Sequence, residues 1–235
     1  MPNEPSVPSI VRRAQDTRGI FTRFLDVLLD GVVHLKRRWD WSRRVVDRLP
    51  AWVTPNGITV ARMALVVPIL WLIATEGYGW AFWLTVLSFI GDYVDGALAS
   101  VRGQYTELGK ILDPLADKVV NYGILGFLAP ELPAVFLPPI WICAFIGLLL
   151  TGIRLRKMIV FRRRGQAIPA SPANAPGKLK TVFEMVGIPA LVLALFLRNA
   201  GWVGGTFFLW FGGLLLAASI PLAAWSFLGQ RRAAS

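Results

Sequence analysis

Four aspartates at helical spacing carry the clearest chemical signal in this chain. Asp92 and Asp95 are three residues apart, and Asp113 and Asp117 are four apart, so each pair lies on one face of its helix. A short connection, residues 101–110, predicts an antiparallel return that brings the two pairs together. Four converging carboxylates require compensating positive charge. Two divalent cations supply it, and oxygen ligands are those that Mg²⁺ and Mn²⁺ prefer.

Two such ions are a recurring device for phosphoryl transfer, in which they clamp a phosphate. Gly96 follows Asp95 directly and Gly109 opens the second helix, so the backbone there leaves room for a bulky ligand. Two alternatives remain open: a cation pathway, or structural ion pairs with nearby basic residues. Those basic residues are Arg62, Arg102, Lys110 and Lys118. Glu184 is a fifth acidic residue within an apolar stretch.

The rest of the chain is too apolar for an ordinary soluble protein. Of its 235 residues, 55% are hydrophobic and 17% charged, with a mean hydropathy of +0.55. A membrane-spanning helix requires about 20 mostly apolar residues. Six stretches meet this requirement: 57–75, 79–100, 111–129, 134–154, 181–197 and 203–228. The sequence therefore predicts an all-α integral membrane bundle of six transmembrane helices. With one cysteine and one histidine, a zinc site built on these residues is excluded.

Positive charge predicts the orientation of this bundle. The net charge is +11, and ten of the 25 Lys and Arg residues fall within residues 1–50. Six more fall within residues 154–164, and with six spans both segments lie on the same side of the membrane. Since basic loops stay in the cytoplasm, we expect both termini and the aspartates on the cytoplasmic side of a multi-pass cell-membrane protein.

The N-terminal segment is predicted to be separate from the bundle. Residues 20–35 have apolar side chains at helical spacing, which indicates an amphipathic helix on the membrane surface; the alternative is a helix that packs on a partner protein. The basic run 36–44 suits anionic lipid better than nucleic acid, since no nucleic-acid-binding fold accompanies it. We therefore expect a cytoplasmic segment at 1–50 and a membrane domain at 51–230.

The aspartates belong to a longer pattern. The run D92-Y-V-D95-G96-A-L-A99-S100, followed after eight residues by G109-K-I-L-D113-P-L-A-D117, resembles the signature of the CDP-alcohol phosphotransferase family, D-x2-D-G-x2-A-R-x8-G-x3-D-x3-D. Ser100 departs from it, because the family has arginine there. The resemblance implies transfer of a phosphatidyl-type group from a CDP-linked lipid to an alcohol, with release of CMP, and it implies a homodimer. A transporter or cation carrier, and a non-catalytic family member, are the alternatives.

The resemblance also implies roles for individual residues. Asp92, Asp95, Asp113 and Asp117 would bind two Mg²⁺ or Mn²⁺ ions, and Asp117 would act as the general base. The residues implied in binding the CDP-lipid, CDP-diacylglycerol, are Asn56, Gly57, Ile58, Thr59, Gly96, Ala99, Ser100 and Thr106. For Asn56 and Thr59 the alternative is simple helix capping.

The acceptor is predicted from two further runs. D113-P-L-A-D117-K118 and G177-K178-L-K180-T181 look similar to bacterial phosphatidylglycerophosphate synthases, which implies glycerol 3-phosphate; inositol phosphate and phosphatidylglycerol are alternatives. A phosphorylated acceptor requires cations, and the candidates are Arg154, Lys178 and Lys180. The alternative for each is an ordinary basic anchor at the membrane face.

Overall fold

A computed structural model describes residues 46–50, 52–104, 106–163 and 175–232. All of them belong to one compact unit, Trp41–Ser235. The predicted surface helix at 20–35 and the basic run at 36–44 lie outside the described residues. They stay predictions, as does the division of the chain between residues 50 and 51.

Six long helices make up the described part of the chain, which contains no β-strand. Two single 3₁₀ turns, η1 (Ala129–Glu131) and η2 (Ala134–Phe136), join the third helix to the fourth. This confirms the all-α prediction, and each helix overlaps one predicted span. The long helices are α3 (Pro55–Ala74), α4 (Tyr78–Arg102), α5 (Glu107–Leu128), α6 (Leu137–Arg163), α7 (Ala175–Asn199) and α8 (Gly204–Arg232).

Five of these helices are long and apolar enough to cross a membrane: α3, α4, α6, α7 and α8. Helix α5 does not meet that criterion because Asp113, Asp117 and Lys118 lie within it. The helices therefore match the six predicted segments, while the number of apolar spans among the described residues is five. Several apolar helices make the chain a multi-pass membrane protein.

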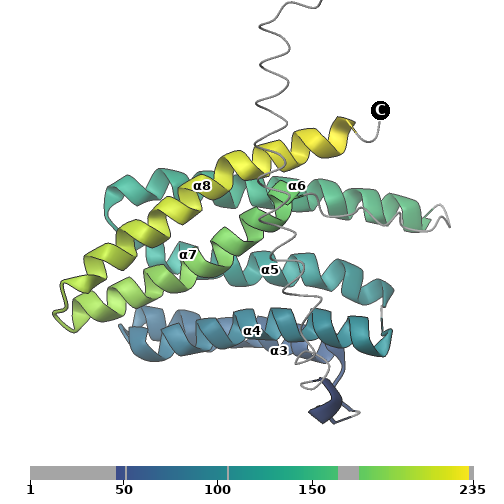
Figure 1. The fold of residues 1–235 in the computed structure, drawn as a ribbon, viewed down its shortest axis with the longest axis horizontal. Coiled ribbons are helices and arrows are strands. Elements are labelled where there is room, and N and C mark those ends of the chain that lie inside the picture. The colour runs from purple at the N-terminus through teal and green to yellow at the C-terminus, as the bar shows by residue number, and fades with distance from the viewer. Residues whose placement is uncertain (1–45, 51, 105, 164–174, 233–235) are drawn as a thin grey trace, which may run out of the picture. The chain divides into compact units, whose positions relative to one another are not determined.

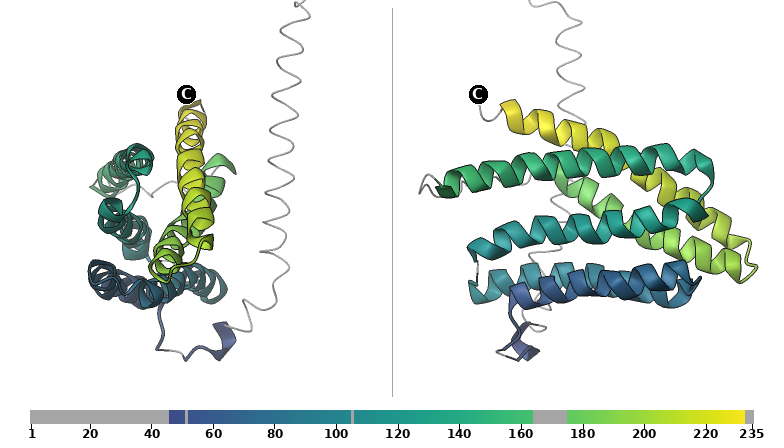
Figure 2. Two further views of the ribbon diagram at one scale, coloured as in Figure 1. Left: turned by 90° about the vertical axis from the view of Figure 1, so that its left-hand side faces the viewer. Right: turned by 180° about the vertical axis from the view of Figure 1, so that it is seen from behind.

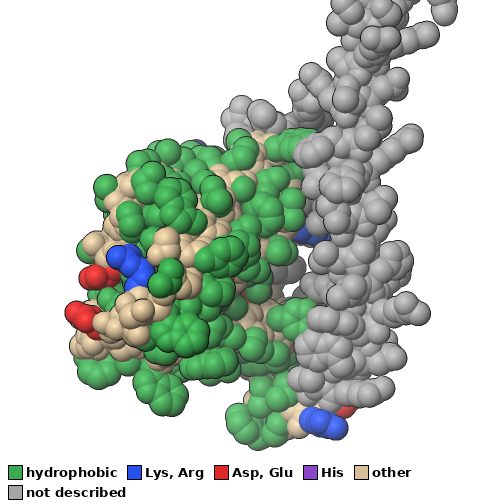
Figure 3. Space-filling model, turned by 60° about the vertical axis from the view of Figure 1, so that its left-hand side comes forward, with side chains coloured by type: hydrophobic (Ala, Val, Ile, Leu, Met, Phe, Trp, Pro, Cys, Tyr) green, Lys and Arg blue, Asp and Glu red, His purple; other side chains and the backbone are tan. Residues whose placement is uncertain are grey.

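The outer surface of the bundle is apolar. Figure 3 shows one face on which hydrophobic side chains predominate and a few charged ones gather at an edge. Large apolar side chains that would be buried in a soluble protein are more than half exposed here, among them Trp71, Trp83, Phe145 and Phe207. Such a surface suits contact with lipid tails, since a large exposed apolar patch in water is rare.

The helices pack as two sets. Helices α3, α4, α5 and α6 run roughly parallel to a common line, and α7 and α8 cross them obliquely (Figures 1 and 2). Helix α3 packs on both α4 and α5, α4 contacts α7, and α7 packs along α8. The buried core includes Ile69, Ile124, Leu128, Ile188 and Leu191. This packing places the first turns of α3 beside the end of α4 and the start of α5.

Capping residues define the ends that meet there. The Thr54 side chain accepts a hydrogen bond from the Gly57 amide and caps α3, and Thr106 accepts from the Gly109 amide and caps α5. Helix α4 ends at Arg102 and is capped by Gly103, whose φ of 63° is the left-handed conformation that favours glycine. So few residues separate α4 from α5 that the chain must reverse sharply, as the sequence predicts.

Candidate active site

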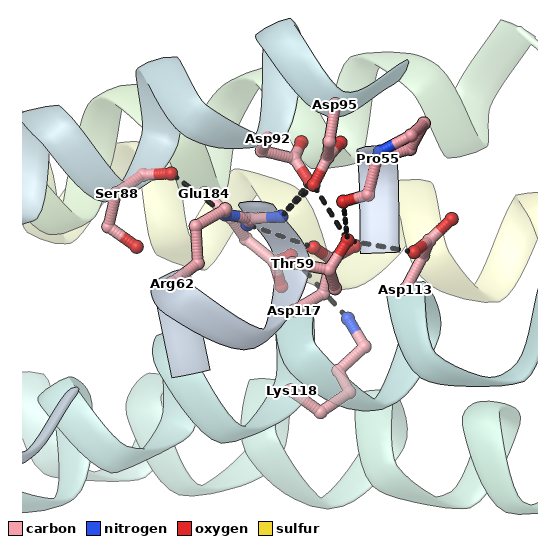
Figure 4. Close-up of polar contacts among 10 residues, drawn as sticks. All are labelled: Pro55, Thr59, Arg62, Ser88, Asp92, Asp95, Asp113, Asp117, Lys118 and Glu184. Atoms are coloured by element: carbon pink, nitrogen blue, oxygen red, sulfur yellow. Dashed lines mark hydrogen bonds and ion pairs between the residues drawn. The ribbon is translucent and has the colours of Figure 1, made fainter. Parts of the chain in front are cut away.

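Arg62 of α3 lies among the carboxylates of α4 and α5 (Figure 4). Its Nη1 is 2.6 Å from Asp92 Oδ1 and 3.3 Å from Asp95 Oδ2, and its Nη2 is 3.4 Å from Asp117 Oδ1. The Arg62 Nε donates to the Ser88 carbonyl at 2.9 Å. With only 3% of the arginine exposed, this guanidinium is a buried charge held by opposite charges, as a stable buried charge must be.

Thr59 joins the fourth aspartate to this group. Its hydroxyl lies 3.0 Å from Asp95 Oδ2 and 3.3 Å from Asp113 Oδ1, and also 3.1 Å from the Pro55 carbonyl one turn earlier in α3. One hydroxyl proton can serve only one of these oxygens at a time. The structure therefore brings all four predicted aspartates together, around Arg62 and Thr59.

The charge of this group favours a further cation. Four carboxylates gather around one guanidinium and one hydroxyl, and their oxygens are the ligands that Mg²⁺ and Mn²⁺ prefer. As these side chains lie, no three acidic, histidine or cysteine residues of the described part are close enough to hold one ion. The Arg62 guanidinium stands between them. The carboxylate oxygens thus fit a divalent cation as ligands, provided that these carboxylates turn away from Arg62.

A glycine in α4 admits the arginine. A Cβ atom at Gly91 would lie 3.0 Å from both Cγ and Cδ of Arg62, which is tighter than ordinary van der Waals contact. The absence of a side chain at this position lets the Arg62 stem cross α4 on its way to Asp92. Nothing in the spacing of the aspartates indicates this requirement.

One side of the aspartates is open. A Cβ atom at Gly96 would have no neighbour within 4 Å, and both Gly96 and Ser100, one turn later on the same face, are exposed. Ala99 is partly buried. These three residues, predicted to contact the CDP-lipid, leave an accessible strip of α4 that ends at Asp95.

The other residues predicted to contact the CDP-lipid lie where the N-terminus of α3 approaches the N-terminus of α5. Asn56 Nδ2 donates to Thr106 Oγ1 at 3.0 Å, and the helix cap of α3 is Thr54 rather than Asn56 or Thr59. The capping alternative for those two residues is therefore wrong, because Thr54 caps α3, Asn56 bonds to Thr106 and Thr59 bonds to Asp95. Gly57 is exposed and Ile58 partly buried in the same turn.

Arg102 belongs to none of these carboxylate contacts. Its guanidinium donates to the Leu49 carbonyl at 2.6 Å and the Val53 carbonyl at 2.9 Å. These bonds attach the segment before α3 to the end of α4. Of the basic residues considered as ion-pair partners, Arg62 pairs with the aspartates, and Arg102 does not.

A second charged cluster lies next to Asp117, between α5 and α7. Glu184 Oε1 is 2.5 Å from Lys180 Nζ, and Glu184 Oε2 is 3.9 Å from Lys118 Nζ. The Cys143 thiol donates to Glu184 Oε1 at 3.2 Å, and only 1% of Glu184 is exposed. Figure 4 shows Lys118 and Glu184 beside Asp117. We call Lys118, Lys180 and Glu184 the lysine–glutamate cluster.

The three predicted acceptor residues have different positions. Lys180 is buried in the lysine–glutamate cluster, whereas Lys178, two residues earlier in α7, is exposed. Arg154 lies in α6, and its side chain is outside the described residues. Neither Lys118 nor Glu184 was predicted to join Lys180. Two signals were available for Glu184: it is an acidic residue within an apolar stretch, and it follows Lys180 by four residues, which places both side chains on one helix face.

Comparison with known proteins identifies the family of this chain. Residues 52–225 match the model of the family described as CDP-alcohol phosphatidyltransferase. The chain belongs to the CDP-alcohol phosphatidyltransferase family. That span contains α3, α4, α5, α6 and α7, and with them every aspartate of the site. Members of this family are generally metal-dependent enzymes of phospholipid biosynthesis in membranes.

Two relatives within this phosphatidyltransferase family are informative. The chain is 30% identical over 187 residues to the "Cardiolipin synthase (CMP-forming)" of Streptomyces coelicolor, covering 71% of this chain and 81% of the relative. It is 31% identical over 158 residues to the "CDP-diacylglycerol--glycerol-3-phosphate 3-phosphatidyltransferase" of Bacillus subtilis, covering 59% of this chain and 76% of the relative. Both names describe enzymes, which supports an enzyme over a carrier.

Proposed function

We propose that this phosphatidyltransferase moves the phosphatidyl group of CDP-diacylglycerol to a hydroxyl of glycerol 3-phosphate and releases CMP. The observation that carries this is the convergence of four aspartates from α4 and α5 beside the open strip at Gly96. Phosphatidylglycerol is the second candidate acceptor, because the Streptomyces relative is named a CMP-forming cardiolipin synthase. Inositol phosphate is the remaining alternative from the sequence.

The reaction needs one proton acceptor and one leaving group. Asp117 takes the proton of the attacking hydroxyl, and the hydroxyl oxygen forms a bond to the phosphorus that carries the diacylglycerol. The bond from that phosphorus to the oxygen of CMP breaks. The Arg62 guanidinium lies 3.4 Å from Asp117 Oδ1, and this contact opens when the carboxylate turns toward the bound ions. Positioning and electrostatic stabilisation account for most of the rate in such transfers.

Divalent cations complete the proposed site. Asp92, Asp95, Asp113 and Asp117 would hold two Mg²⁺ or Mn²⁺ ions, and the Thr59 hydroxyl would donate its one proton to either the Asp95 or the Asp113 carboxylate. When bound, the ions supply Lewis-acid stabilisation of the charge on the transferred phosphate. The excess of four carboxylates over the one guanidinium of Arg62 supports this proposal.

The donor and the acceptor would approach Asp117 from different sides. The cytidine diphosphate group would lie along Gly96, Ala99 and Ser100, with the turn from Asn56 to Thr59 and Thr106 beside it. The acceptor phosphate would bind near Lys180, with Lys118 as the second cation. Lys178 and Arg154 would serve as further cations or as anchors at the membrane face.

An apolar groove would accommodate lipid tails. It has a volume of about 420 Å³ and is lined by α4, α7 and α8, with Phe89, Tyr93 and Phe208 among its residues. Tyr93 follows Asp92 in α4, so the groove reaches the same level of this helix as the aspartates, on another of its faces. We infer a multi-pass protein of the cell membrane with both termini and this site on the cytoplasmic side. The homodimer implied by the family resemblance is part of the same proposal.

A panel of acceptors tests this function. The purified protein receives CDP-diacylglycerol labelled in its acyl chains, with Mg²⁺ or Mn²⁺ and one acceptor at a time: glycerol 3-phosphate, phosphatidylglycerol or inositol phosphate. We expect CMP and labelled phosphatidylglycerophosphate with the first acceptor. Labelled cardiolipin as the only product would assign the second candidate instead. Acceptor-independent uptake of divalent ions without CMP release would support the carrier.

A further inference from the structure

Glu184 is the least exposed charged side chain described in the bundle, and each of its oxygens faces a different lysine. Lys180 Nζ is 2.5 Å from Oε1, and Lys118 Nζ is 3.9 Å from Oε2. Taking a carboxylate out of water and burying it to 1% exposure is costly unless it is paired. Since α7 could have carried an apolar residue here, the placement of a carboxylate between two lysines calls for a role.

The Lys118 ammonium retains unused hydrogen-bond donors. Its separation from Glu184 is too long for a hydrogen bond, and the ammonium also lies over the face of the Tyr122 ring, whose centroid is 5.2 Å away. Among the described residues it has no hydrogen-bond acceptor, although only 16% of the side chain is exposed. An ammonium with three donors and so little solvent is suited to an anionic group from a ligand.

The position of the Lys118 ammonium connects it to the proposed reaction. Lys118 follows Asp117, the proposed base, and lies on the side of α5 that faces α7. The open strip at Gly96 lies on α4, where the cytidine diphosphate group of CDP-diacylglycerol is proposed to bind. An acceptor whose hydroxyl reaches Asp117 therefore has its phosphate within reach of the lysine–glutamate cluster.

The net charge of this cluster is one positive charge, from two lysines and one glutamate. A phosphomonoester such as glycerol 3-phosphate carries about −1.5 to −2 charges at neutral pH, whereas a phosphodiester carries one negative charge. Without Glu184 the cluster would have two positive charges and match the dianion better. The buried carboxylate thus reduces the advantage that a dianionic acceptor would otherwise have.

We propose that Glu184 is a specificity-determining residue, which shifts acceptor selection from phosphomonoesters toward phosphodiesters by partly neutralising Lys118 and Lys180. This inference rests on the proposed function, because it assigns acceptor charge selection to the same site. The inference concerns how efficiently the protein uses a phosphomonoester acceptor relative to a phosphodiester acceptor. It makes the same prediction whichever of the two reacts faster in the wild-type protein.

Two soluble acceptors separate the effect of phosphate charge from that of the rest of the acceptor. Glycerol 3-phosphate and its methyl phosphodiester present the same glycerol hydroxyls and differ by about one negative charge. The kcat/KM for each, measured as CMP release from CDP-diacylglycerol in detergent micelles, gives a monoester-to-diester ratio. Separate KM and kcat values show whether binding or turnover changes. A general loss of stability would lower both values of kcat/KM together and leave the ratio unchanged.

The Glu184→Gln variant should raise this ratio by about tenfold or more, since a unit charge near a phosphate is worth at least that much at an effective dielectric constant near 20. The matched control is the double variant Lys180→Gln, Glu184→Gln, which restores a net charge of one and should have the wild-type ratio. If Glu184→Gln does not fold, Lys118→Gln lowers the net charge to zero and should lower the ratio.

An unchanged ratio in Glu184→Gln, with transfer still measurable, would overturn the proposal. So would an equal rise in the double variant, because its net charge matches the wild type. Failure of the proposed function has a different result: the wild-type protein would release no CMP with either probe or with phosphatidylglycerol.

Discussion

The Asn56 amide and the Thr106 hydroxyl, 50 residues apart in the chain, are joined by a hydrogen bond of 3.0 Å. The same hydroxyl caps α5 by accepting from the Gly109 amide at 2.9 Å. The bond therefore ties the start of α3 to the start of α5, at the point where the nucleotide of the donor is proposed to bind.

Gly109→Ala tests the importance of this bond. A Cβ atom there would lie 2.9 Å from Asn56 Oδ1 and 3.1 Å from Thr106 Oγ1, so the Asn56 side chain must move. We expect the KM for CDP-diacylglycerol to rise by roughly fivefold to tenfold, equivalent to one lost hydrogen bond of about 1 kcal/mol. The control is Gly126→Ala, where a Cβ meets nothing within 4 Å. Equal KM values in the two variants would contradict a role for this bond in donor binding.

Gly96→Leu tests whether the open strip receives the donor. Because a Cβ at this position meets nothing within 4 Å, the variant should fold with an unchanged melting temperature. The KM for CDP-diacylglycerol should rise at least about tenfold, since the added side chain occupies the proposed nucleotide surface. Gly152→Leu, at another open glycine on α6, is the control. Wild-type KM in Gly96→Leu would show that the donor lies elsewhere.

Ser100→Arg restores the residue that the family signature has at this position. Ser100 is exposed, one turn from Gly96, and a guanidinium there would face the diphosphate of the donor. A hydrogen bond to a charged group is worth about 1.5–3 kcal/mol, so KM for CDP-diacylglycerol should fall about tenfold or more. Ser100→Met, of similar reach without charge, should not lower KM. No change in KM for Ser100→Arg would mean that Ser100 does not face the donor.

Arg62→Met tests the guanidinium as counter-ion of the aspartates. Removing one partner of a buried ion pair destabilises a protein by about 3–5 kcal/mol, so thermal unfolding without divalent ions should begin at a markedly lower temperature. Adding Mg²⁺ should raise the melting temperature more in the variant than in wild type, because the freed carboxylates bind it more readily. Arg102→Met, which loses only carbonyl contacts, should respond to Mg²⁺ as wild type does. Equal Mg²⁺ responses in Arg62→Met and wild type would contradict this role.

The local sequence pattern predicted the long helices, and it predicted which aspartates share a helix face. The apolar stretches located all six long helices, and the spacing of Asp92, Asp95, Asp113 and Asp117 placed each pair on one helix face. These features depend on residues close together in the chain, where the 3.6-residue period of a helix decides the outcome.

Contacts between distant segments were not predictable in the same way. Arg62 reaches Asp117 only because α3 packs on both α4 and α5 and Gly91 leaves room for its stem. The pairing of Lys118 with Glu184 likewise depends on how α5 packs against α7. No periodicity within one helix specifies which of its charged residues meets one on another helix.

Release of CMP from CDP-diacylglycerol tests the central claim most directly. Wild-type protein with glycerol 3-phosphate and Mg²⁺ or Mn²⁺ should release CMP together with an equal amount of labelled phospholipid product. Asp117→Asn should remain folded, since Arg62 keeps Asp92 and Asp95 as partners. It should lose turnover by at least about a hundredfold, because the amide cannot take the proton of the attacking hydroxyl. Wild-type turnover in Asp117→Asn would remove Asp117 as the base. Absence of CMP release by the wild-type protein with every acceptor of the panel would contradict the account as a whole.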